Sequence, residues 1–493
     1  MESVDRNVAE LLNDAMNDGV RFPTTWHDRC SPTPGTENRS IAFMPTSMKA
    51  LRCGPLNGHI QVPGDKSISH RALILGALST GVTTIKGLLE AEDVLATANA
   101  LRRLGIPIER ADAVWRVYGR GVGGLSAPDG PLDFGNSGTG VRLMMGVIAG
   151  HDMQVICTGD VSLCRRPMSR VLQPLKEMGL TVAESDRDML PLTLQGSSDL
   201  IPIDYRLPMP SAQVKSAILL AGLHAPGATT VIEPEATRDH SERMLRHFGA
   251  DLTILDRDDG TRAITVAGDS ELQGANVIVP GDPSSAAFMT TAALIIPGSD
   301  ITIENVLVNQ TRFGFYQTVQ EMGADLTLQN ERNNGGEPVA DIRVRASALK
   351  GVTVPAARAP SMIDEYPCLA CLAAFAEGET RMDGLGELKV KESDRLAATR
   401  AGLSTCGVRV RIDGDSLIVA GSRTVPGGGI VETKQDHRIA MSFLTLGLAS
   451  ENPVTVDDSD MIATSFPEFT QLMAELGGKF KEARTLDREG SSE

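Results

Sequence analysis

Apolar and polar positions along this chain follow a unit that recurs six times. In the first copy, the turn residues 63–65 precede a stretch whose apolar residues recur at helical spacing from Ile68 to Leu78. This pattern predicts a helix, with Ser67 as its N-cap. A near copy opens at residues 279–282 with the same four residues, Val-Pro-Gly-Asp. Looser copies of the polar start and the following apolar helix begin at Asn136, Ser211, Ser361 and Asp436.

Each unit continues with a small-residue turn, a short strand, a second helix and a closing glycine. The closing glycines follow one another at steps of 74, 70, 74, 84 and 70 residues, and they are Gly105, Gly179, Gly249, Gly323, Gly407 and Gly477. A repeated period indicates a repeat architecture, and units of this length that mix helix and strand differ from the common solenoids. We therefore predict an α/β (α+β) fold of six units, three before and three after the second Val-Pro-Gly-Asp.

The two copies of Val-Pro-Gly-Asp also suggest domain boundaries. We predict one domain over residues 63–279 and a discontinuous one over 49–62 and 280–480. Residues 49–61 are expected to form a strand; if it pairs with the second half, the chain crosses twice between the domains, which can then open and close.

The two ends of the chain do not share the repeat pattern. Residues 1–48 include a polar stretch rich in Pro and Thr, which we interpret as a disordered extension rather than a regulatory arm. Residues 481–493 are predicted to be a frayed tail.

Composition narrows the class of protein. A formal net charge of −16 argues against nucleic acid or an anionic membrane as a partner. No apolar run approaches the roughly 18–20 residues of a membrane span, and no secretory signal is present. Seven cysteines, an odd number, suggest a reducing compartment, so we expect a cytoplasmic protein. The pair Cys368 and Cys371 lies in an apolar helical stretch, which favours a core position over zinc binding.

Cations recur at corresponding helix starts and strand ends. They are Lys66, Arg71, Arg166, Arg238, Lys391, Arg395 and Arg438. If these starts face one cleft, helix dipoles converge there as well, which predicts a ligand or ligand pair with several negative groups. Asp364 and Glu392 are the acids among these cations. The cations would keep them ionised, which suits a general base. Lys66 could serve as a proton donor or an electrostatic clamp.

Other chemistry receives less support. No His, Cys, Asp or Glu spacing indicates a metal site, and we expect no metal or cofactor. Glycines 135, 138 and 140 precede a helix, where their backbone can approach a ligand closely, but their spacing does not match a dinucleotide fingerprint. His437, between an aspartate and an arginine, is expected to pack rather than to shuttle protons.

Five motifs in fixed order resemble the 5-enolpyruvylshikimate-3-phosphate (EPSP) synthase family. They are Gly-Asp-Lys-Ser-Ile-Ser-His-Arg (64–71), Gly-Asn-Ser-Gly-Thr-Gly (135–140), Ser-Ala-Gln-Val-Lys-Ser-Ala (211–217), Lys-Glu-Ser-Asp-Arg-Leu (391–396) and Asp-His-Arg-Ile-Ala-Met (436–441). The resemblance covers roughly Met48 to Phe480 and is greatest to the bacterial branch that includes glyphosate-tolerant enzymes.

The resemblance implies the two-domain enolpyruvyl transferase fold, with six βαβαββ repeats, three per domain, and closure around the substrates. It also implies a cofactor-free, monomeric enzyme of aromatic amino acid synthesis. Such an enzyme transfers the enolpyruvyl group of phosphoenolpyruvate to the 5-hydroxyl of shikimate 3-phosphate through a tetrahedral ketal.

The same resemblance implies roles for individual residues. The family's shikimate 3-phosphate contacts correspond to Lys66, Ser67, Arg71, Ser211, Ala212, Gln213, Arg238, Asp364 and Lys391. Its phosphoenolpyruvate contacts correspond to Lys66, Gly138, Arg166, Gln213, Arg395 and Arg438. Asp364 matches the base for the 5-hydroxyl proton. Glu392, together with Lys66, matches the group that protonates the methylene carbon and later reverses that transfer.

Two positions depart from the family pattern. Thr464 stands where other branches carry a lysine that contacts the phosphate of phosphoenolpyruvate, so the resemblance does not imply that contact for this chain. Gly138 stands where the tolerant enzymes carry alanine, which predicts inhibition by glyphosate.

Two alternative functions remain open from the sequence. The related enolpyruvyl transfer to a UDP-sugar normally uses a reactive cysteine, and Cys164 lies near the matching segment, two residues before Arg166. A non-catalytic anion-binding or scaffold protein of the same fold is the other. Asp364 and Glu392 argue against the scaffold, because anion binding alone has no use for carboxylates.

Overall fold

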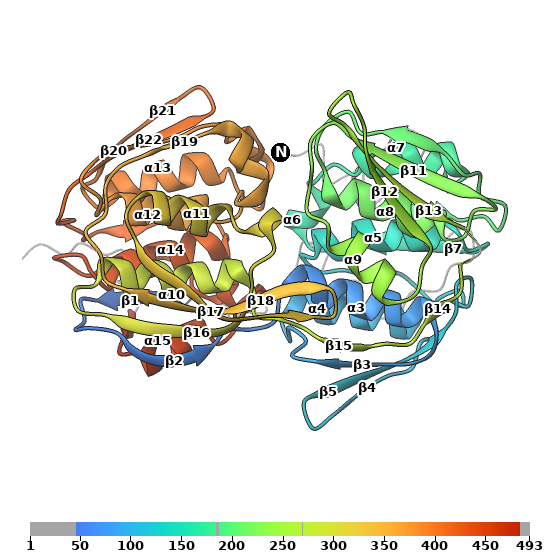
Figure 1. Cartoon of the computed structure of the whole chain (residues 1–493), viewed down its shortest axis with the longest axis horizontal. Helices are drawn as coiled ribbons and strands as arrows, with labels where there is room; N and C mark the ends of the chain where they lie inside the picture. The colour runs from blue at the N-terminus through green and yellow to red at the C-terminus, as the bar shows by residue number, and fades with distance from the viewer. Residues whose placement is uncertain (1–45, 184–186, 269, 484–493) are drawn as a thin grey trace, which may run out of the picture. The chain divides into compact units, whose positions relative to one another are not determined.

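The repeat pattern of the sequence becomes a set of six small β-sheets with helices packed against them (Figure 1). The computed structural model describes residues 46–183, 187–268 and 270–483. Their buried apolar side chains form two clusters. One is drawn almost entirely from residues 68–279 and the other from residues 50–62 and 286–476. We refer to residues 63–279 as lobe 1, and to residues 46–62 with 280–483 as lobe 2.

Lobe 1 contains three repeats, each a sheet with its helices. The first has strands β14 (Leu272–Gln273), β15 (Asn276–Ile278), β3 (Ser79–Lys86), β5 (Val114–Arg120) and β4 (Ile108–Ala111), with helices α3 (Lys66–Leu78) and α4 (Glu92–Arg103). The second has β6 (Leu132–Asp133), β7 (Gln154–Thr158), β9 (Leu192–Gln195) and β8 (Thr181–Val182), with α5 (Gly138–Ala149), α6 (Val161–Cys164) and α7 (Ser169–Met178). The third has β10 (Asp204–Arg206), β11 (Ala228–Glu233), β13 (Arg262–Ala267) and β12 (Leu252–Asp256), with α8 (Ala212–Gly222) and α9 (His240–His247).

Lobe 2 repeats the same arrangement three times. The first sheet has β2 (Asn57–Gln61), β16 (Asp300–Leu307), β18 (Glu337–Arg345) and β17 (Asp325–Asn334), with α10 (Pro283–Ile295), η1 (Gln310–Arg312) and α11 (Gly314–Glu321). The second has β19 (Thr353–Val354), β20 (Gly378–Met382), β22 (Ser416–Gly421) and β21 (Arg409–Asp413), with η2 (Ala356–Ser361), α12 (Tyr366–Ala373), η3 (Gly386–Val390) and α13 (Arg395–Thr405). The third has β23 (Ile430–Val431), β24 (Val454–Val456), β1 (Ser47–Leu51) and β25 (Lys479–Ala483), with α14 (His437–Gly447), η4 (Asp460–Thr464) and α15 (Phe469–Glu475).

The predicted fold class of six βαβαββ repeats is confirmed by this topology. In the second and third repeats of lobe 1 and the second repeat of lobe 2, four strands follow one another along the chain and pair in the order first, second, fourth, third. All six closing glycines adopt a positive φ, between 78° and 120°. A side chain is strained in that conformation, which explains why glycine ends the second helix in every unit.

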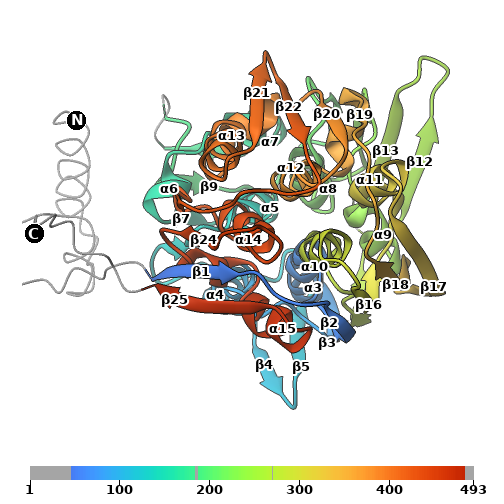
Figure 2. The ribbon, with the colours of Figure 1, turned by 90° about the vertical axis from the view of Figure 1, so that its left-hand side faces the viewer.

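The N-terminal strands contribute to two different sheets of lobe 2. Residues 49–61 were expected to form one strand, but β1 and β2 are separate elements. β2 pairs in parallel with β16, whereas β1 lies between β24 and β25 and is antiparallel to both. Figure 2 shows β1, in blue, beside the red strands from the end of the chain. The strand before Pro63 therefore pairs with the second half, and the chain crosses between the lobes twice.

Three sequence-based boundaries need correction. The N-cap of α3 is Asp65 and not Ser67: the Asp65 carboxylate accepts a hydrogen bond from the Ile68 N–H at 2.8 Å. β1 begins at Ser47, inside the expected extension, and β25 runs to Ala483, inside the expected tail. Backbone pairing between these two strands orders both ends. The rest of the predicted extension and tail, residues 1–45 and 484–493, lies outside the described residues.

This pairing leads to a prediction about truncation. A variant that lacks residues 1–45 should keep the melting temperature and the activity of the full chain. A variant that lacks residues 1–51 also loses β1, which leaves β24 and β25 without their shared partner. We expect its Tm to fall by more than about 5 °C, because each kcal/mol lost shifts Tm by roughly 2–4 °C in domains of 150–250 residues. Differential scanning calorimetry of both variants measures this, and a large drop in the shorter truncation would contradict it.

Two further expectations concern the core and the membrane. Cys368 and Cys371 are fully buried in α12 as free thiols, which confirms their core position. Among the described residues, no helix has the length and apolar character needed to cross a membrane.

Candidate active site

Helices α3, α5 and α8 of lobe 1 and α14 of lobe 2 begin at the predicted motifs. Side chains at the four starts accept backbone hydrogen bonds, and these caps are Asp65, Ser137, Ser211 and Asp436. Each cap satisfies part of a helix end, and the remaining N–H groups and the dipole favour a bound anion. The sequence motifs therefore supply helix starts with cations beside them.

The first group of site residues gathers around the start of α5. The Arg142 guanidinium donates to the Gln213 side-chain oxygen at 3.1 Å and to the Gly138 carbonyl at 3.3 Å. Arg166 donates to the Asn136 side-chain oxygen at 2.6 Å, and its buried Nε has no hydrogen-bond partner among the described residues. Gly138 and Gln213, 75 residues apart, are thus joined by one arginine in a place suited to an anion.

Arg142 is absent from the residues singled out in the sequence. Burial, and then the charge of Arg166, lower the pKa of Arg142 to about 10, so the guanidinium remains protonated at neutral pH. The sequence could have indicated Arg142 through its position, because it lies one helical turn after Gly138 on the same helix.

A second arginine lies deeper in lobe 1. Arg71 is 5% exposed and donates to the Ser241 hydroxyl and the Ser216 hydroxyl, each at 2.8 Å, and to the Ser67 carbonyl at 3.0 Å. Burial lowers the pKa of Arg71 to about 10, which still leaves it charged. Lys66, at the start of α3, forms an ion pair with Asp93. Ser67 lies at the start of α3 beside these cations, and Ser211 and Ala212 lie at the start of α8.

The main charged group surrounds Asp364. Its carboxylate lies 2.8 Å from Arg238, 3.4 Å from Lys391 and 3.4 Å from Arg395, and its backbone carbonyl accepts from Arg438 at 3.3 Å. Burial alone would raise the pKa of Asp364, but the surrounding cations outweigh it and hold that pKa well below its ordinary value. Arg238 follows β11 in lobe 1, so this ion pair joins the two lobes directly.

Glu392 lies against the same arginine. Its carboxylate is 2.6 Å from Arg395, which is 1% exposed and also donates to Asp436 at 2.8 Å. Burial opposes ionisation, but the cations Arg395, Arg166 and Lys391 hold the pKa of Glu392 well below its ordinary value. Both candidate proton-transfer carboxylates are therefore ionised in the ligand-free protein.

His437 fits a packing role. Burial lowers its pKa to about 3, so the ring is neutral across the physiological range. Its Nδ1 lies 3.4 Å from the hydroxyl of Thr464, the position where other branches carry lysine. Thr464 is buried and donates to the Met461 carbonyl at 2.7 Å.

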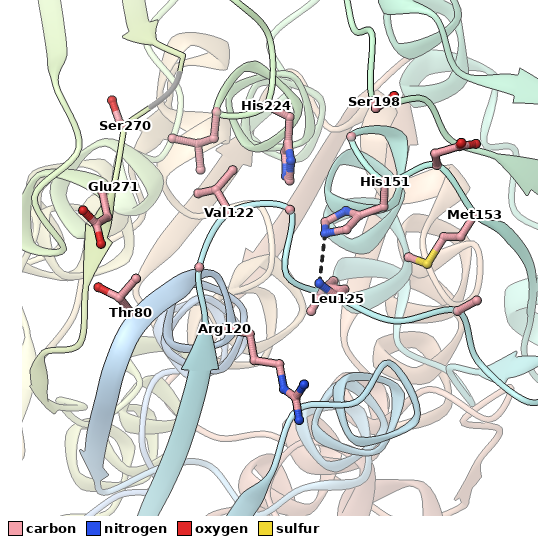
Figure 3. Close-up of a pocket in the computed structure, with 16 residues that line it drawn as sticks. Thr80, Arg120, Val122, Leu125, His151, Met153, Ser198, His224, Ser270 and Glu271 are labelled. Carbon is pink, nitrogen blue, oxygen red and sulfur yellow. Dashed lines mark hydrogen bonds between the residues drawn. The ribbon is translucent and has the colours of Figure 1, made fainter.

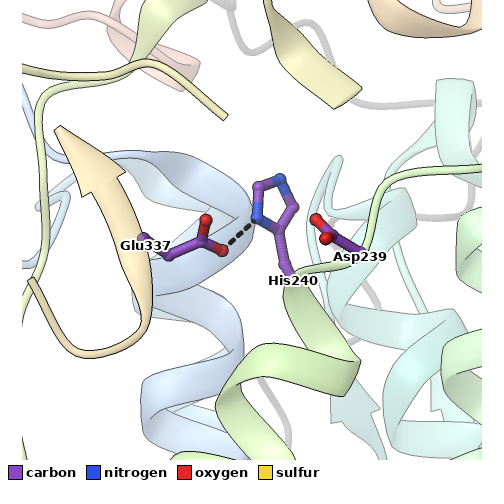
Figure 4. A group of neighbouring side chains, drawn as sticks. All are labelled: Asp239, His240 and Glu337. Atoms are coloured by element: carbon purple, nitrogen blue, oxygen red, sulfur yellow. Dashed lines mark hydrogen bonds and ion pairs between the residues drawn. The ribbon is translucent and has the colours of Figure 1, made fainter. Parts of the chain in front are cut away.

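A separate polar group joins the lobes at α9 and β18 (Figure 4). Potential ligand atoms of Asp239, His240 and Glu337 lie within 4.8 Å of one another. His240 Nδ1 is 2.8 Å from Glu337, Asn309 donates to both carboxylates at 2.7 and 2.9 Å, and Arg243 pairs with Asp239 at 2.7 Å. Protein donors already occupy these carboxylates, so we interpret the group as a hydrogen-bonded joint and not as a metal site.

A pocket of about 780 Å³ lies at the other end of α5 and α8, beyond their C-termini (Figure 3). His151 and His224 line it. His151 accepts from the Leu125 N–H at 3.3 Å through Nε2 and donates to the Val147 carbonyl through Nδ1, which defines a neutral ring. None of the predicted site residues lines this pocket, so the charged groups at the helix starts remain the candidate active site.

Comparison with known proteins identifies the family of this chain. The profile of the family described as EPSP synthase (3-phosphoshikimate 1-carboxyvinyltransferase) matches residues 52–473. The 3-phosphoshikimate 1-carboxyvinyltransferase of Parvibaculum lavamentivorans is 60% identical over 437 residues, which cover 88% of this chain and 97% of that protein. The enzyme of the same name from Rhodopseudomonas palustris is 58% identical over 441 residues, 89% of this chain and 99% of that protein.

Solved structures of related proteins indicate the same family and fold. The EPSP synthase of Acinetobacter baumannii superposes with a TM-score of 0.80 at 42% identity, covering 89% of this chain and 100% of that chain. The enolpyruvyl transferase NikO of Streptomyces tendae, at 16% identity and a TM-score of 0.70, shares the fold over 89% of this chain and 99% of its own. With its six repeats and its five motifs, the chain belongs to the EPSP synthase family.

Proposed function

We infer that this chain transfers the enolpyruvyl group of phosphoenolpyruvate to the 5-hydroxyl of shikimate 3-phosphate and releases phosphate. It is a 3-phosphoshikimate 1-carboxyvinyltransferase, an enzyme of chorismate and aromatic amino acid biosynthesis. Beyond family membership, the observation that carries this conclusion is the group around Asp364. Two ionised carboxylates, Asp364 and Glu392, lie among cations from both lobes. The two substrates together carry two phosphates and two carboxylates, which need such cations.

We propose that shikimate 3-phosphate binds between the lobes at Asp364. Its contacts would be Lys66, Ser67, Arg71, Ser211, Ala212, Gln213, Arg238, Asp364 and Lys391. The buried guanidinium of Arg71 and the starts of α3 and α8 favour its anionic groups. The Arg238–Asp364 ion pair would have to yield to the substrate, because both residues are proposed contacts.

Phosphoenolpyruvate is proposed to bind beside it, at the start of α5. Its contacts would be Lys66, Gly138, Arg166, Gln213, Arg395 and Arg438. The unpartnered Nε of Arg166 supports this placement, because a buried donor gains a partner when an anion binds. Arg142 lies against Gly138 and Gln213 and would add a further positive charge.

The proposed mechanism assigns one proton transfer to each carboxylate. Asp364 takes the proton of the 5-hydroxyl as that oxygen attacks C2 of phosphoenolpyruvate, and Glu392, with Lys66, delivers a proton to C3. Removal of that proton from the resulting methyl group and departure of phosphate then give the product. Asp364 acts as a base in the ionised form in which the cations hold it, whereas Glu392 must enter the step protonated. Substrate anions bound at Arg395 and Arg166 would raise the pKa of Glu392, so that it carries the proton that it delivers to C3 and later takes back. Preorganised cations also stabilise the charges of the ketal.

Phosphate release on mixing the two substrates tests this function. The wild-type protein should release phosphate with shikimate 3-phosphate as acceptor and none with a UDP-sugar acceptor. The environment of Cys164 supports this choice. Burial raises the pKa of its thiol, which lies 3.4 Å from the Gly159 carbonyl, whereas a reactive cysteine needs a lowered pKa. Phosphate release only when the acceptor is the UDP-sugar would indicate the related transferase. No phosphate release with either acceptor would indicate a binding protein.

Closure of the lobes gives a second test. The proposed contacts come from both lobes, so shikimate 3-phosphate should draw them together and promote binding of the second substrate. We expect the radius of gyration from small-angle scattering to decrease when shikimate 3-phosphate is added at saturation. Inorganic phosphate at the same concentration is the control, because it cannot span both lobes. Identical scattering curves with and without the substrate would argue against the two-domain hinge.

Three further properties are proposed with the function. Glyphosate should inhibit at the phosphoenolpyruvate site. Few large apolar side chains of the described residues are exposed, which supports a monomer. The six cysteines among these residues are free thiols, which supports a reducing, cytoplasmic location.

A further inference from the structure

The two copies of Val-Pro-Gly-Asp lie side by side where the chain crosses between the lobes. The Asp65 N–H donates to the Pro280 carbonyl at 2.7 Å, and the Asp282 N–H donates to the Pro63 carbonyl at 2.8 Å. Each aspartate also caps a helix, Asp65 that of α3 and Asp282 that of α10. Two buried carboxylates, 0% and 6% exposed, therefore meet at the crossing.

One side chain pairs with both carboxylates. Arg312, the last residue of η1, is 3% exposed. Its Nη1 donates to the Asp65 carboxylate at 2.9 Å, and its Nη2 donates to the Asp282 carboxylate at 3.1 Å. Burial alone would raise the pKa of Asp282, but the charges of Arg312 and then Arg438, together with backbone hydrogen bonds from Ser284 and Lys66, lower that pKa below its ordinary value. A buried carboxylate without this partner would be strongly unfavourable.

The same arginine reaches toward both sets of proton-transfer groups. Asp65 directly precedes Lys66, and the backbone N–H of Lys66 lies 3.4 Å from the carboxylate of Asp282. Nη2 of Arg312 donates to the Ser284 hydroxyl at 2.8 Å, and that hydroxyl donates to Glu365. Glu365 is the neighbour of Asp364 in sequence. A continuous chain of contacts thus joins the start of α3 to the segment before α12.

We propose that Arg312 is a positioning residue for the enolpyruvyl transfer, because its fork binds the two crossing segments to each other. It thereby fixes the start of α3, which carries Lys66, relative to the segment before α12, which carries Asp364. It would act through Asp65 and Asp282 and would not touch either substrate. A single fork that spans two carboxylates is a property of arginine, since the lysine ammonium is a point charge. The proposal rests on the proposed function.

The test is Arg312→Lys, which keeps the charge and loses the fork. We expect kcat to fall at least about tenfold, because small displacements of catalytic groups can cost up to 10²-fold in rate. KM for both substrates should change much less, since no proposed substrate contact other than Lys66 is bonded to these aspartates. The matched control is Arg343→Lys, which breaks a two-bond pair with Asp300 in the same lobe, away from the crossing. The control should keep wild-type kcat.

A second variant separates positioning from folding. In Arg312→Met/Asp282→Asn the cluster keeps its net charge, and asparagine can still cap α10. The Tm of this double variant should be well above that of Arg312→Met and close to the wild-type Tm. Its kcat should stay low.

Phosphate release by the wild-type protein in the same assay distinguishes the two hypotheses. An inactive wild type would overturn the proposed function. Suppose that the wild type is active and that a folded variant without the fork keeps a kcat within about threefold of the wild-type value. That result would overturn the positioning role and leave the proposed function intact. Low kcat in Arg312→Lys and in the double variant, with retained Tm, supports the positioning role.

Discussion

Asp364→Asn should abolish most of the turnover while the substrates still bind. The amide has nearly the shape of the carboxylate but cannot accept the hydroxyl proton. General bases typically contribute 10²- to 10⁴-fold, so we expect kcat to fall by roughly that factor. Binding of shikimate 3-phosphate should be unchanged or tighter, because the variant removes one negative charge from among Arg238, Lys391 and Arg395.

Phosphate-release kinetics measure kcat, and isothermal titration calorimetry measures binding of shikimate 3-phosphate. The matched control is Asp300→Asn, which removes a carboxylate paired with Arg343 at 2.6 Å on the surface of the same lobe. The control should keep both values. An Asp364→Asn kcat within about threefold of wild type would eliminate this residue as the base, because that loss is far smaller than a general base supplies.

The repeat architecture could be predicted because each unit carries its own information. The polar start, the apolar helix and the closing glycine are local features, and they recur with the same physical cause in each copy. A positive φ at Gly105 and at Gly477 comes from the same helix-ending turn, although 372 residues separate them. The candidate cations were visible for the same reason, since they occupy corresponding places in successive units.

Pairings between distant segments could not be predicted in this way. The ion pair between Arg238 and Asp364 depends on how the lobes meet. Arg142 belongs to the candidate site because it binds the side chain of Gln213, 71 residues away. Arg312 lies in a short turn outside every motif, and its partners come from both crossings. Boundaries failed where pairing extends an element, as in β1 and β25, and where two polar residues competed to cap α3.

Gly138→Ala should weaken glyphosate inhibition far more than it raises KM for phosphoenolpyruvate. A Cβ at this position would lie 3.0 Å from the guanidinium nitrogens of both Arg142 and Arg166, and 3.8 Å from Leu163. The two arginines are flexible at their ends and can shift by a few tenths of an ångström. The methyl group therefore occupies space between the proposed phosphoenolpyruvate cations, at the first residue of α5.

Glyphosate is longer than phosphoenolpyruvate, so the lost volume should affect the inhibitor more than the substrate. A change of one methylene in a pocket is commonly worth about 1–3 kcal/mol, which corresponds to a roughly ten- to two-hundredfold rise in the inhibition constant. Wild-type inhibition should be appreciable and competitive with phosphoenolpyruvate. Stability should change little, because a glycine without a positive φ at a helix start can be replaced by alanine with no backbone strain.

Inhibition constants for both proteins, measured at matched saturation with phosphoenolpyruvate, test this prediction. Gly54→Ala is the matched control, since its Cβ would meet nothing within 4 Å and the site is remote. A competing explanation is that residues other than Gly138 already make the wild type tolerant of glyphosate. Leu143 follows Arg142 on α5, and Thr464 replaces the lysine of other branches. A wild type that is already insensitive, with no further change in Gly138→Ala, would favour that explanation, and Thr464→Lys would then be the variant expected to restore inhibition.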